Sequence, residues 1–156
     1  MGSVRPARPS EAKSLSALAR RSKAHWDYSQ EELAVFRTEL TISPEDVESH
    51  RTHVLEEGGQ IVGFCTLTPR GPGVVELEHI FIEPSYLGKG FGSLLFHHAC
   101  GIARKAGFRR LVILSDPNAS GFYHAVGAQL ESDIPSSIRG RTIPYFVVPL
   151  GDQGAA

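Results

Sequence analysis

The segment 74–114 constrains the fold most, because it combines a strand, a glycine-rich turn, a helix and a second strand in that order. Residues 74–83 read as a strand that follows a turn at 69–73. Residues 91–106 carry apolar side chains at i, i+3, i+4 and i+7 spacing, which predicts a core-facing helix that Gly107 terminates. Residues 111–114 are a continuous apolar run, typical of a strand buried on both faces. This order predicts two parallel strands joined by a helical crossover.

The remaining segments predict an antiparallel extension of this sheet and further helices. Gly58-Gly59 joins two apolar segments in a hairpin, and Ser29 begins a capping box with Glu32. The sequence therefore predicts a mixed α+β fold with a mostly antiparallel sheet, in one domain over 1–156 with an ordered core at about 4–150. The other expected elements are helices at 10–23 (capped by Ser10), from 29, from 43 (with Pro44 at its first position) and at 118–126, and strands at 52–57, 60–68, 128–134 and 143–150.

Composition excludes several classes of protein. The chain has 156 residues, of which 41% are hydrophobic and 21% charged, as in an ordinary soluble domain. Its net charge of -1 provides no general attraction to nucleic acid or to an anionic membrane. No run of 18 apolar residues occurs, so we expect no membrane span. Cys65 and Cys100 lack CxxC spacing, and we expect both to be reduced and buried in a cytoplasmic protein.

The turn before the long helix has the composition of an anion site. Gly88, Gly90 and Gly92 let a ligand approach the backbone, and the helix that follows offers unpaired N–H groups. Lys89 adds a cation. The turn matches neither the P-loop GxxxxGK[ST] nor the dinucleotide pattern GxGxxG, so these two nucleotide-binding folds are disfavoured. A simple connection between strand and helix is the alternative interpretation.

The turn at 87–92 and the segment 118–127 carry two motifs that, in this order, resemble the GNAT superfamily of acyl-CoA-dependent N-acyltransferases. The first is Leu87-Gly88-Lys89-Gly90-Phe91-Gly92, similar to the family pattern Q/R-x-x-G-x-G/A, except that Leu87 replaces the usual Gln or Arg. The second is Asn118 followed by Phe122-Tyr123-His124-Ala125-Val126-Gly127, similar to N-x(n)-[LF]-Y-x-x-x-G. The resemblance implies a three-layer α/β/α fold in which a splayed parallel pair of strands holds acetyl-CoA.

The resemblance assigns cosubstrate contacts to particular positions. It places the acyl group and pantetheine along the backbone of one strand, the pyrophosphate at the glycine turn, and the thioester sulfur near Tyr123. Because Leu87 removes one polar side chain, we expect the turn to bind mainly through its backbone. The cosubstrate-binding residues implied are Ile80, Phe81, Ile82, Gly88, Lys89, Gly90, Phe91, Gly92, Ser93, Asn118 and Tyr123.

Acyl transfer to an amine requires a base, because an amine with a pKa near about 10 is protonated at neutral pH. Glu76 and Glu78 alternate onto one face of the strand at 74–83, and two neighbouring carboxylates suit a base that works near neutrality. His79, on the other face, is the third candidate, and a solvated strand face is the alternative interpretation. Tyr123 can protonate or hydrogen-bond the departing thiolate, or simply pack beside Phe122.

The acceptor cannot be named from the sequence, but one segment is a candidate for holding it. Trp26, Asp27 and Tyr28 lie between the first two expected helices, where an aromatic pair and a carboxylate can hold a cationic amine. Trp26 can equally anchor the two helices. No His, Cys or Asp spacing indicates a metal. We therefore expect direct acetyl transfer from acetyl-CoA to a small-molecule or peptide amine. We expect no metal and no nucleic acid to take part, and we expect the protein to form a homodimer. The alternatives are a non-catalytic acyl-CoA-binding module and an unrelated nucleotide-binding protein.

Overall fold

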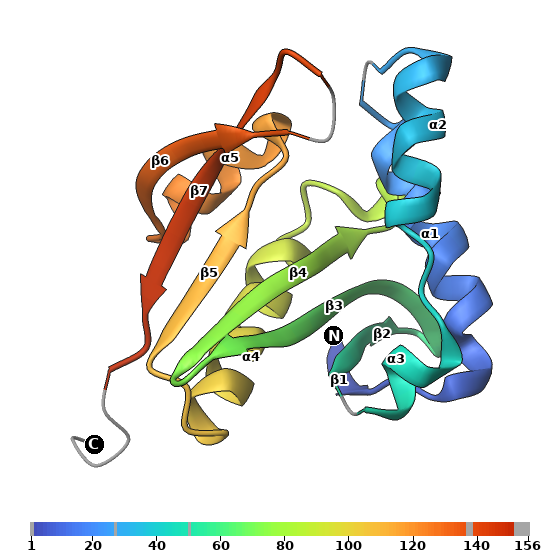
Figure 1. Ribbon diagram of the computed structural model, residues 1–156. Helices are drawn as coiled ribbons and strands as arrows, with labels where there is room; N and C mark the ends of the chain where they lie inside the picture. The colour runs from blue at the N-terminus through green and yellow to red at the C-terminus, as the bar shows by residue number, and fades with distance from the viewer. Residues whose placement is uncertain (1, 27, 50, 137–138, 152–156) are drawn as a thin grey trace. The chain divides into compact units, whose positions relative to one another are not determined.

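The computed structural model describes residues 2–26, 28–49, 51–136 and 139–151. Figure 1 shows its helices and strands. The chain divides into two compact units, each made of two segments. Unit 1 contains Met1–Thr66 and His79–Leu95, and unit 2 contains Leu67–Glu78 and Phe96–Ala156. Three elements contribute residues to both units: β3 (Gln60–Gly71), β4 (Val74–Ile82) and α4 (Phe91–Lys105).

The strand order confirms the predicted fold class. Seven strands form one mixed sheet in the order β1-β2-β3-β4-β5-β7-β6. β4 pairs with β5 (Arg110–Leu114) in parallel, as the segment 74–114 predicts. The pairs β1–β2, β2–β3, β5–β7 and β6–β7 are antiparallel.

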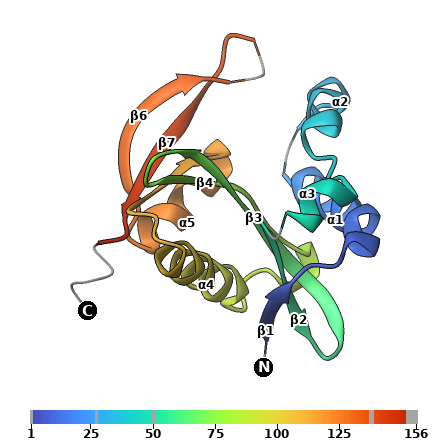
Figure 2. The same ribbon diagram turned by 60° about the horizontal axis from the view of Figure 1, so that its bottom comes forward.

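Unit 1 begins with a strand that the sequence did not reveal. β1 (Ser3–Pro6) pairs with β2 (Thr52–Glu57), and α1 (Ala12–Ala24) and α3 (Pro44–Glu48) lie to one side of these two strands (Figure 2). The apolar stripe predicted for α1 is buried, with Leu15 fully enclosed. Four residues carry too short a pattern to predict a strand, and the pairing depends on β2, which lies about fifty residues later.

The capping residues of α2 and α3 are the predicted ones, whereas that of α1 is not. The Ser29 Oγ accepts from the Glu32 N–H at 3.1 Å at the start of α2 (Gln30–Glu39), and the Ser43 Oγ accepts from the Asp46 N–H at 3.1 Å at the start of α3. The prediction that Ser10 caps the first helix is wrong. A short 3-10 turn, Pro9–Glu11, precedes α1, and the Glu11 carboxylate there accepts from the Arg8 N–H at 2.7 Å.

The hairpins of the sheet differ slightly from the prediction. Gly58 and Gly59 have φ angles of 59° and 81°, and both form the tight turn between β2 and β3. β3 extends to Gly71, three residues beyond the predicted end, and the turn into β4 is Gly71-Pro72-Gly73. Pro69 and Arg70 therefore lie in a strand, and this places the Arg70 side chain beside the glutamates of β4.

Unit 2 is built on β5, β6 (Gln129–Pro135) and β7 (Thr142–Pro149), with α5 (Ser120–Ala125) lying on the same side of these strands as α4 in Figures 1 and 2. Phe96 of α4 contacts Phe122 and Tyr123 of α5 at ring distances of 6.1 and 6.2 Å. Tyr123 in turn contacts Phe146 of β7 at 5.5 Å. An aromatic cluster thus fixes α5, and with it the segment of the second motif.

The buried face of α4 is rotated from the predicted stripe. Phe96 and Cys100 are buried together with Leu95, Ala99 and Ala103. The i+7 spacing from Phe91 places His98 on the predicted stripe and so predicts a histidine at the edge of the core, but this residue is exposed, and that prediction is wrong. Phe96, Ala99, Cys100 and Ala103 also follow the i, i+3, i+4, i+7 spacing, so the sequence offers two overlapping stripes, and the contact of Phe96 with α5 decides between them.

Candidate active site

The glycine turn has the backbone that an anion site requires. Gly88 and Gly90 have φ angles of 78° and 83°, in the left-handed region, and a Cβ built at either position meets no heavy atom within 4 Å. Residues 87–90 are exposed. α4 starts at Phe91, and the Leu94 N–H donates back to the Gly90 carbonyl at 3.1 Å. The N–H groups before Leu94 therefore have no carbonyl within the helix to donate to, which fits a pyrophosphate.

The side chains of the turn form a small aromatic and cationic group. The Lys89 ammonium lies 5.5 Å from the centre of the Tyr86 ring, and Tyr86 packs at 6.0 Å from Phe91 at the start of α4. Leu87 is 41% exposed, so it is not a core residue. The turn thus presents one cation, Lys89, and an apolar Leu87 where the family pattern has a polar side chain.

In unit 1, residues 80–82 of β4 lie very close to the backbone of β3. A Cβ added to Gly63 would lie 2.8 Å from the Phe81 carbonyl and 2.7 Å from Ile82 Cδ1, so only glycine fits there. The next residue, Glu83, donates its N–H to the Val62 carbonyl at 2.8 Å. Its carboxylate accepts two hydrogen bonds from Arg21 of α1 at 2.8 and 2.7 Å. This bidentate pair connects α1 to the start of the glycine turn, and Arg21 lowers the pKa of Glu83.

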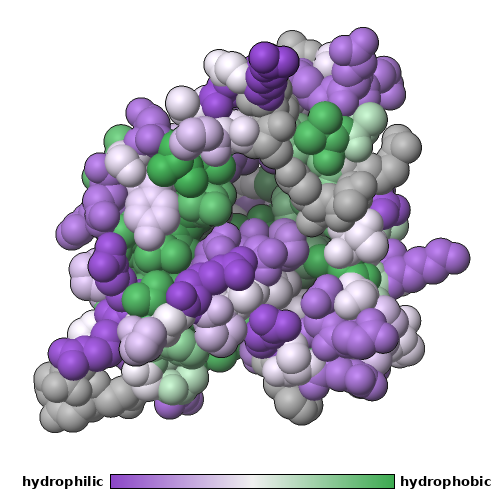
Figure 3. All heavy atoms as spheres, in the orientation of Figure 1, coloured by the Kyte–Doolittle hydropathy of each residue, from purple (hydrophilic) through white to green (hydrophobic). Residues whose placement is uncertain are grey.

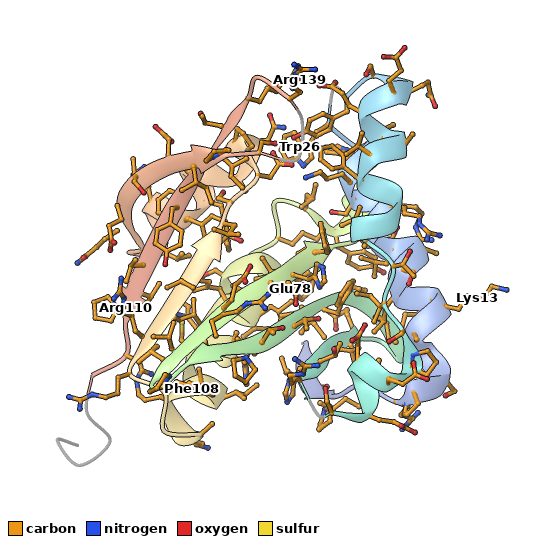
Figure 4. The ribbon with its side chains drawn as sticks, viewed as in Figure 1. Lys13, Trp26, Glu78, Phe108, Arg110 and Arg139 are labelled. Carbon is orange, nitrogen blue, oxygen red and sulfur yellow. The ribbon has the colours of Figure 1, made fainter. Side chains whose placement is uncertain are left out.

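The two glutamates of β4 lie together on one face, as their alternation predicts. Arg70 contacts both: its Nε donates to Glu76 Oε1 at 2.7 Å, and its Nη2 lies 3.8 Å from Glu78 Oε2. The Glu76 side chain is 11% exposed and that of Glu78 39%. In Figure 4 Glu78 lies on the face of β4 that is turned to the viewer. Glu78 is accessible to an incoming molecule, whereas Glu76 is nearly enclosed.

The parallel ladder ends at the first of these glutamates. The paired residues are Val74 with Arg110, Val75 with Leu111, and Glu76 with Val112. Glu78 comes after the last pair, and β5 also continues to Leu114, which is 41% exposed. Figure 3 shows apolar side chains on the face of β5 and β7 seen in that view. Within unit 2, therefore, Glu78 follows the point where β4 and β5 stop pairing, and Glu76 sits beside an apolar strand.

His79 occupies the opposite side of β4. Its ring stacks on Phe81 at 6.0 Å and lies 6.4 Å from the Phe64 ring. The side chain thus packs among aromatic rings and is not grouped with Glu76 and Glu78. The geometry favours the packed interpretation of His79 over the third candidate base.

Tyr123 and Asn118 lie in the second motif, in unit 2. Tyr123 is 4% exposed, and burial raises the pKa of its phenol well above the ordinary value, with the Asp116 charge raising it further. The hydroxyl therefore keeps its proton at physiological pH. Asn118 is exposed in the 3-10 turn Pro117–Ala119, where its N–H donates to Asp116 Oδ1 at 2.8 Å.

The predicted acceptor segment is only partly described, since Asp27 lies outside the described residues. Trp26 is 40% exposed and contacts His25 edge-on at 5.2 Å, so it is not a buried anchor. Tyr28 contacts Phe36 at 5.0 Å, and the Lys23 ammonium lies 4.1 Å from the Phe36 ring and 5.3 Å from the Tyr28 ring. The pair that holds a cation is therefore Tyr28 with Phe36, not the predicted Trp26 with Tyr28, and the cation is a lysine of the chain itself.

Four residues that the sequence patterns did not single out lie against the candidate site residues or, for one of them, against the adjoining Glu83. They belong to α1 and β3, and they meet β4 or Glu83 from another part of the chain, so no local motif marks them. The signal available in the sequence was small: a glycine inside a strand pattern indicates close approach of another backbone. These residues are Arg21, Gly63, Thr68 and Arg70.

Among the described residues, no three His, Cys, Asp or Glu side chains are grouped as metal ligands. Within the same part of the chain, none of the helices combines the length and the apolar character that crossing a bilayer requires.

Known proteins with the same fold carry coenzyme A. The N-acetyltransferase PaiA from Thermoplasma acidophilum, solved with coenzyme A, superposes with a TM-score of 0.80 at 19% identity, over 96% of this chain and 99% of that one. YncA from Salmonella typhimurium, solved with its cofactor acetyl-CoA, has a TM-score of 0.74 at 16% identity, over 97% of this chain and 95% of that one. At these identities the likeness shows the fold.

Sequence comparison gives the family. Glucosamine 6-phosphate N-acetyltransferase from Trypanosoma brucei brucei is 32% identical over 75 residues, which cover 44% of this chain and 51% of that protein, so the chain spans about half the length of this relative. The model of the acetyltransferase (GNAT) family matches residues 15–128. This match takes in both sequence motifs and covers most of the chain, which therefore belongs to the GNAT family of acetyltransferases.

Proposed function

We propose that this acetyltransferase transfers the acetyl group of acetyl-CoA directly to a primary amine, with the glycine turn as its pyrophosphate site. The observation that carries the proposal is the exposed left-handed backbone at Gly88 and Gly90, directly before the free N-terminus of α4. Backbone amides and the helix dipole favour an anion there. Lys89 supplies the side-chain charge that Leu87 does not.

The proposed base is Glu78, with Glu76 as its neighbour. An acceptor can reach Glu78, because its side chain is 39% exposed and it lies past the last β4–β5 pair. Glu76 is engaged by Arg70 and nearly enclosed. The acceptor ammonium transfers one proton to Glu78, and the neutral nitrogen then forms the N–C bond as the C–S bond breaks. On becoming an amide the nitrogen loses a second proton, and this proton neutralises the departing thiolate.

Tyr123 is proposed to stabilise the departing sulfur. An ordinary thiol has a pKa of about 8.5, so complete proton transfer from a phenol of raised pKa is unfavourable. A hydrogen bond from the phenol to the sulfur carries no such penalty, because the proton stays on oxygen. We therefore propose that Tyr123 donates a hydrogen bond to the sulfur, and that the proton that finally reaches the thiolate comes from the amine.

The acceptor is proposed as a small-molecule or peptide amine bound near Trp26 and Tyr28. The Lys23 ammonium already lies over the rings of Tyr28 and Phe36. This contact supports the proposal, because the aromatic rings of this region suit ammonium groups. Glucosamine 6-phosphate belongs in the first panel of acceptors, since the Trypanosoma relative takes its name from that substrate. A cytoplasmic location and a homodimer stay predictions; light scattering after gel filtration tests the second.

An amine panel with acetyl-CoA, followed by release of free thiol, tests the proposal. Glu78→Gln is expected to lower turnover by about 10²- to 10⁴-fold, as loss of a general base does. Glu76→Gln and Tyr123→Phe complete the set. Unchanged turnover in all three variants would remove this mechanism, whereas tight binding of coenzyme A without turnover of any amine would favour a non-catalytic module.

Thermal shifts separate the donor site from other nucleotide sites. Stabilisation by coenzyme A and not by ATP or NAD follows from the proposal, because a ligand that binds the folded state stabilises it, and more so the tighter it binds. The reverse order would contradict the assignment of the glycine turn.

A further inference from the structure

The two glutamates of β4 have chemically different partners on β3. The Thr68 hydroxyl donates to Glu78 Oε1 at 2.6 Å, and Thr68 is 8% exposed. A hydrogen bond of this length to a carboxylate is charge-assisted and largely shielded from water. Among the described residues, the cation near Glu78 Oε2 is Arg70, whose Nη2 lies at 3.8 Å, beyond hydrogen-bond distance. One oxygen of Glu78 is therefore fixed, and the other is open.

Glu76 is bound in the opposite manner. Its Oε1 accepts from Arg70 Nε at 2.7 Å, in a nearly enclosed position beside Val112 of β5. Arg70 thus donates a hydrogen bond to Glu76 and approaches Glu78 only at ion-pair distance, whereas the side chain that donates a hydrogen bond to Glu78 is the neutral Thr68.

Two charged groups of the described chain lie near Glu78. On β3 this group is Arg70, and on its own strand it is Glu76. The charged residue of β5, Arg110, pairs with Val74 at the other end of the parallel ladder and lies 3.5 Å from Glu131 of β6. The Thr68 hydroxyl is therefore the main polar contact that fixes the orientation of the Glu78 carboxylate.

We propose that Thr68 is a positioning residue that holds Glu78 in the orientation of the base, with Oε2 directed to the acceptor amine. Glu76, in contrast, stays in its ion pair with Arg70 and does not act as the base. The inference rests on the proposed function. Two carboxylates that look equivalent in the sequence acquire separate roles because β3 offers a hydroxyl to one and a guanidinium to the other.

Thr68→Val tests the proposal, because valine keeps the shape and removes the hydroxyl. The assay uses acetyl-CoA with the most active amine of the panel. We expect kcat to fall about tenfold, the size of a lost hydrogen bond to a charged group, with KM for acetyl-CoA unchanged. Thr68→Ser, which keeps the hydroxyl, should restore kcat.

A matched control separates catalysis from stability. The Thr52 hydroxyl on β2 is within hydrogen-bond distance of that of Thr66, at 3.3 Å, and Thr52 is fully buried. Thr52→Val also removes a buried hydroxyl, but one that touches neither glutamate. It should lower the thermal midpoint as much as Thr68→Val and leave kcat unchanged. Should Thr68→Val fail to fold, Thr68→Ala serves as the second variant, with the same expected loss of rate.

A double-mutant cycle distinguishes the failure of this inference from that of the proposed function. In the Glu78→Gln background, Thr68→Val should lower the residual rate no further, because both changes act on one group. If Glu78→Gln is inactive but Thr68→Val keeps the wild-type kcat, the positioning role is wrong and the base stands. If Glu78→Gln keeps full activity, or no panel amine is acetylated, the base assignment fails and the inference fails with it.

Discussion

Replacing Gly90 by alanine separates the strain of the glycine turn from its part in binding. Gly90 has φ 83°, and an added Cβ meets nothing within 4 Å, so backbone conformation alone sets the cost. A non-glycine residue in this region costs about 1–2 kcal/mol, and the stiffer unfolded chain returns about 0.4–1 kcal/mol. The expected net loss is about 1 kcal/mol, or about 2–4 °C in the thermal midpoint of a chain of this size.

Gly59 supplies the matched control. Its φ is 81° and its added Cβ also meets nothing within 4 Å, but it lies in the β2–β3 hairpin. Gly59→Ala therefore carries the same strain at a position without a binding role. The two variants should lose equal stability by differential scanning fluorimetry.

Binding of coenzyme A should distinguish the two variants. The Cβ that Gly90→Ala introduces would fill the open space in front of the amides before α4, and loss of one hydrogen bond to a charged phosphate costs about 1.5–3 kcal/mol. Calorimetric titration should show the dissociation constant of coenzyme A rising by about tenfold to a hundredfold in Gly90→Ala only. Equal affinity in both variants would refute the assignment of this turn to the pyrophosphate.

Three further changes probe the packing around the site. Gly63→Ala should lose about 1–3 kcal/mol in urea unfolding, because its Cβ would meet the Phe81 carbonyl at 2.8 Å and a backbone atom cannot easily move; unchanged stability would show that β3 and β4 can separate. Arg21→Met should flatten the acid dependence of stability. Arg21 lowers the pKa of Glu83, so the pair stabilises the fold above the unfolded carboxyl pKa of about 4.3, and this contribution is lost as the pH falls below it. Urea midpoints at pH 7 and pH 3 should therefore differ less in the variant than in the wild type, and equal differences would contradict the ion pair. Cys100 should resist Ellman's reagent at pH 8 until the protein unfolds, because burial raises the pKa of its thiol to about 11; rapid reaction of the native protein would contradict that burial.

Local interactions explain which features could be predicted from the sequence. The capping boxes at Ser29 and Ser43 join atoms three residues apart, so the residues that form them are visible in any short window. The same holds for the Gly58-Gly59 hairpin and for the glycine turn before α4, where only the backbone of glycine adopts the angles easily. Alternation along β4 placed Glu76 and Glu78 on one face, because the period of a strand is two.

Contacts between distant segments decided the rest. Arg21 and Glu83 are 62 residues apart in the chain and meet through two hydrogen bonds, and Thr68 reaches Glu78 across a hairpin whose turn the sequence placed two residues too early. The sequence by itself determined the elements, the glycine turn and the pair of carboxylates, since these follow from neighbours along the chain. Only the tertiary structure decided which carboxylate is open and which is engaged, because the hydroxyl and the guanidinium that distinguish them come from another strand.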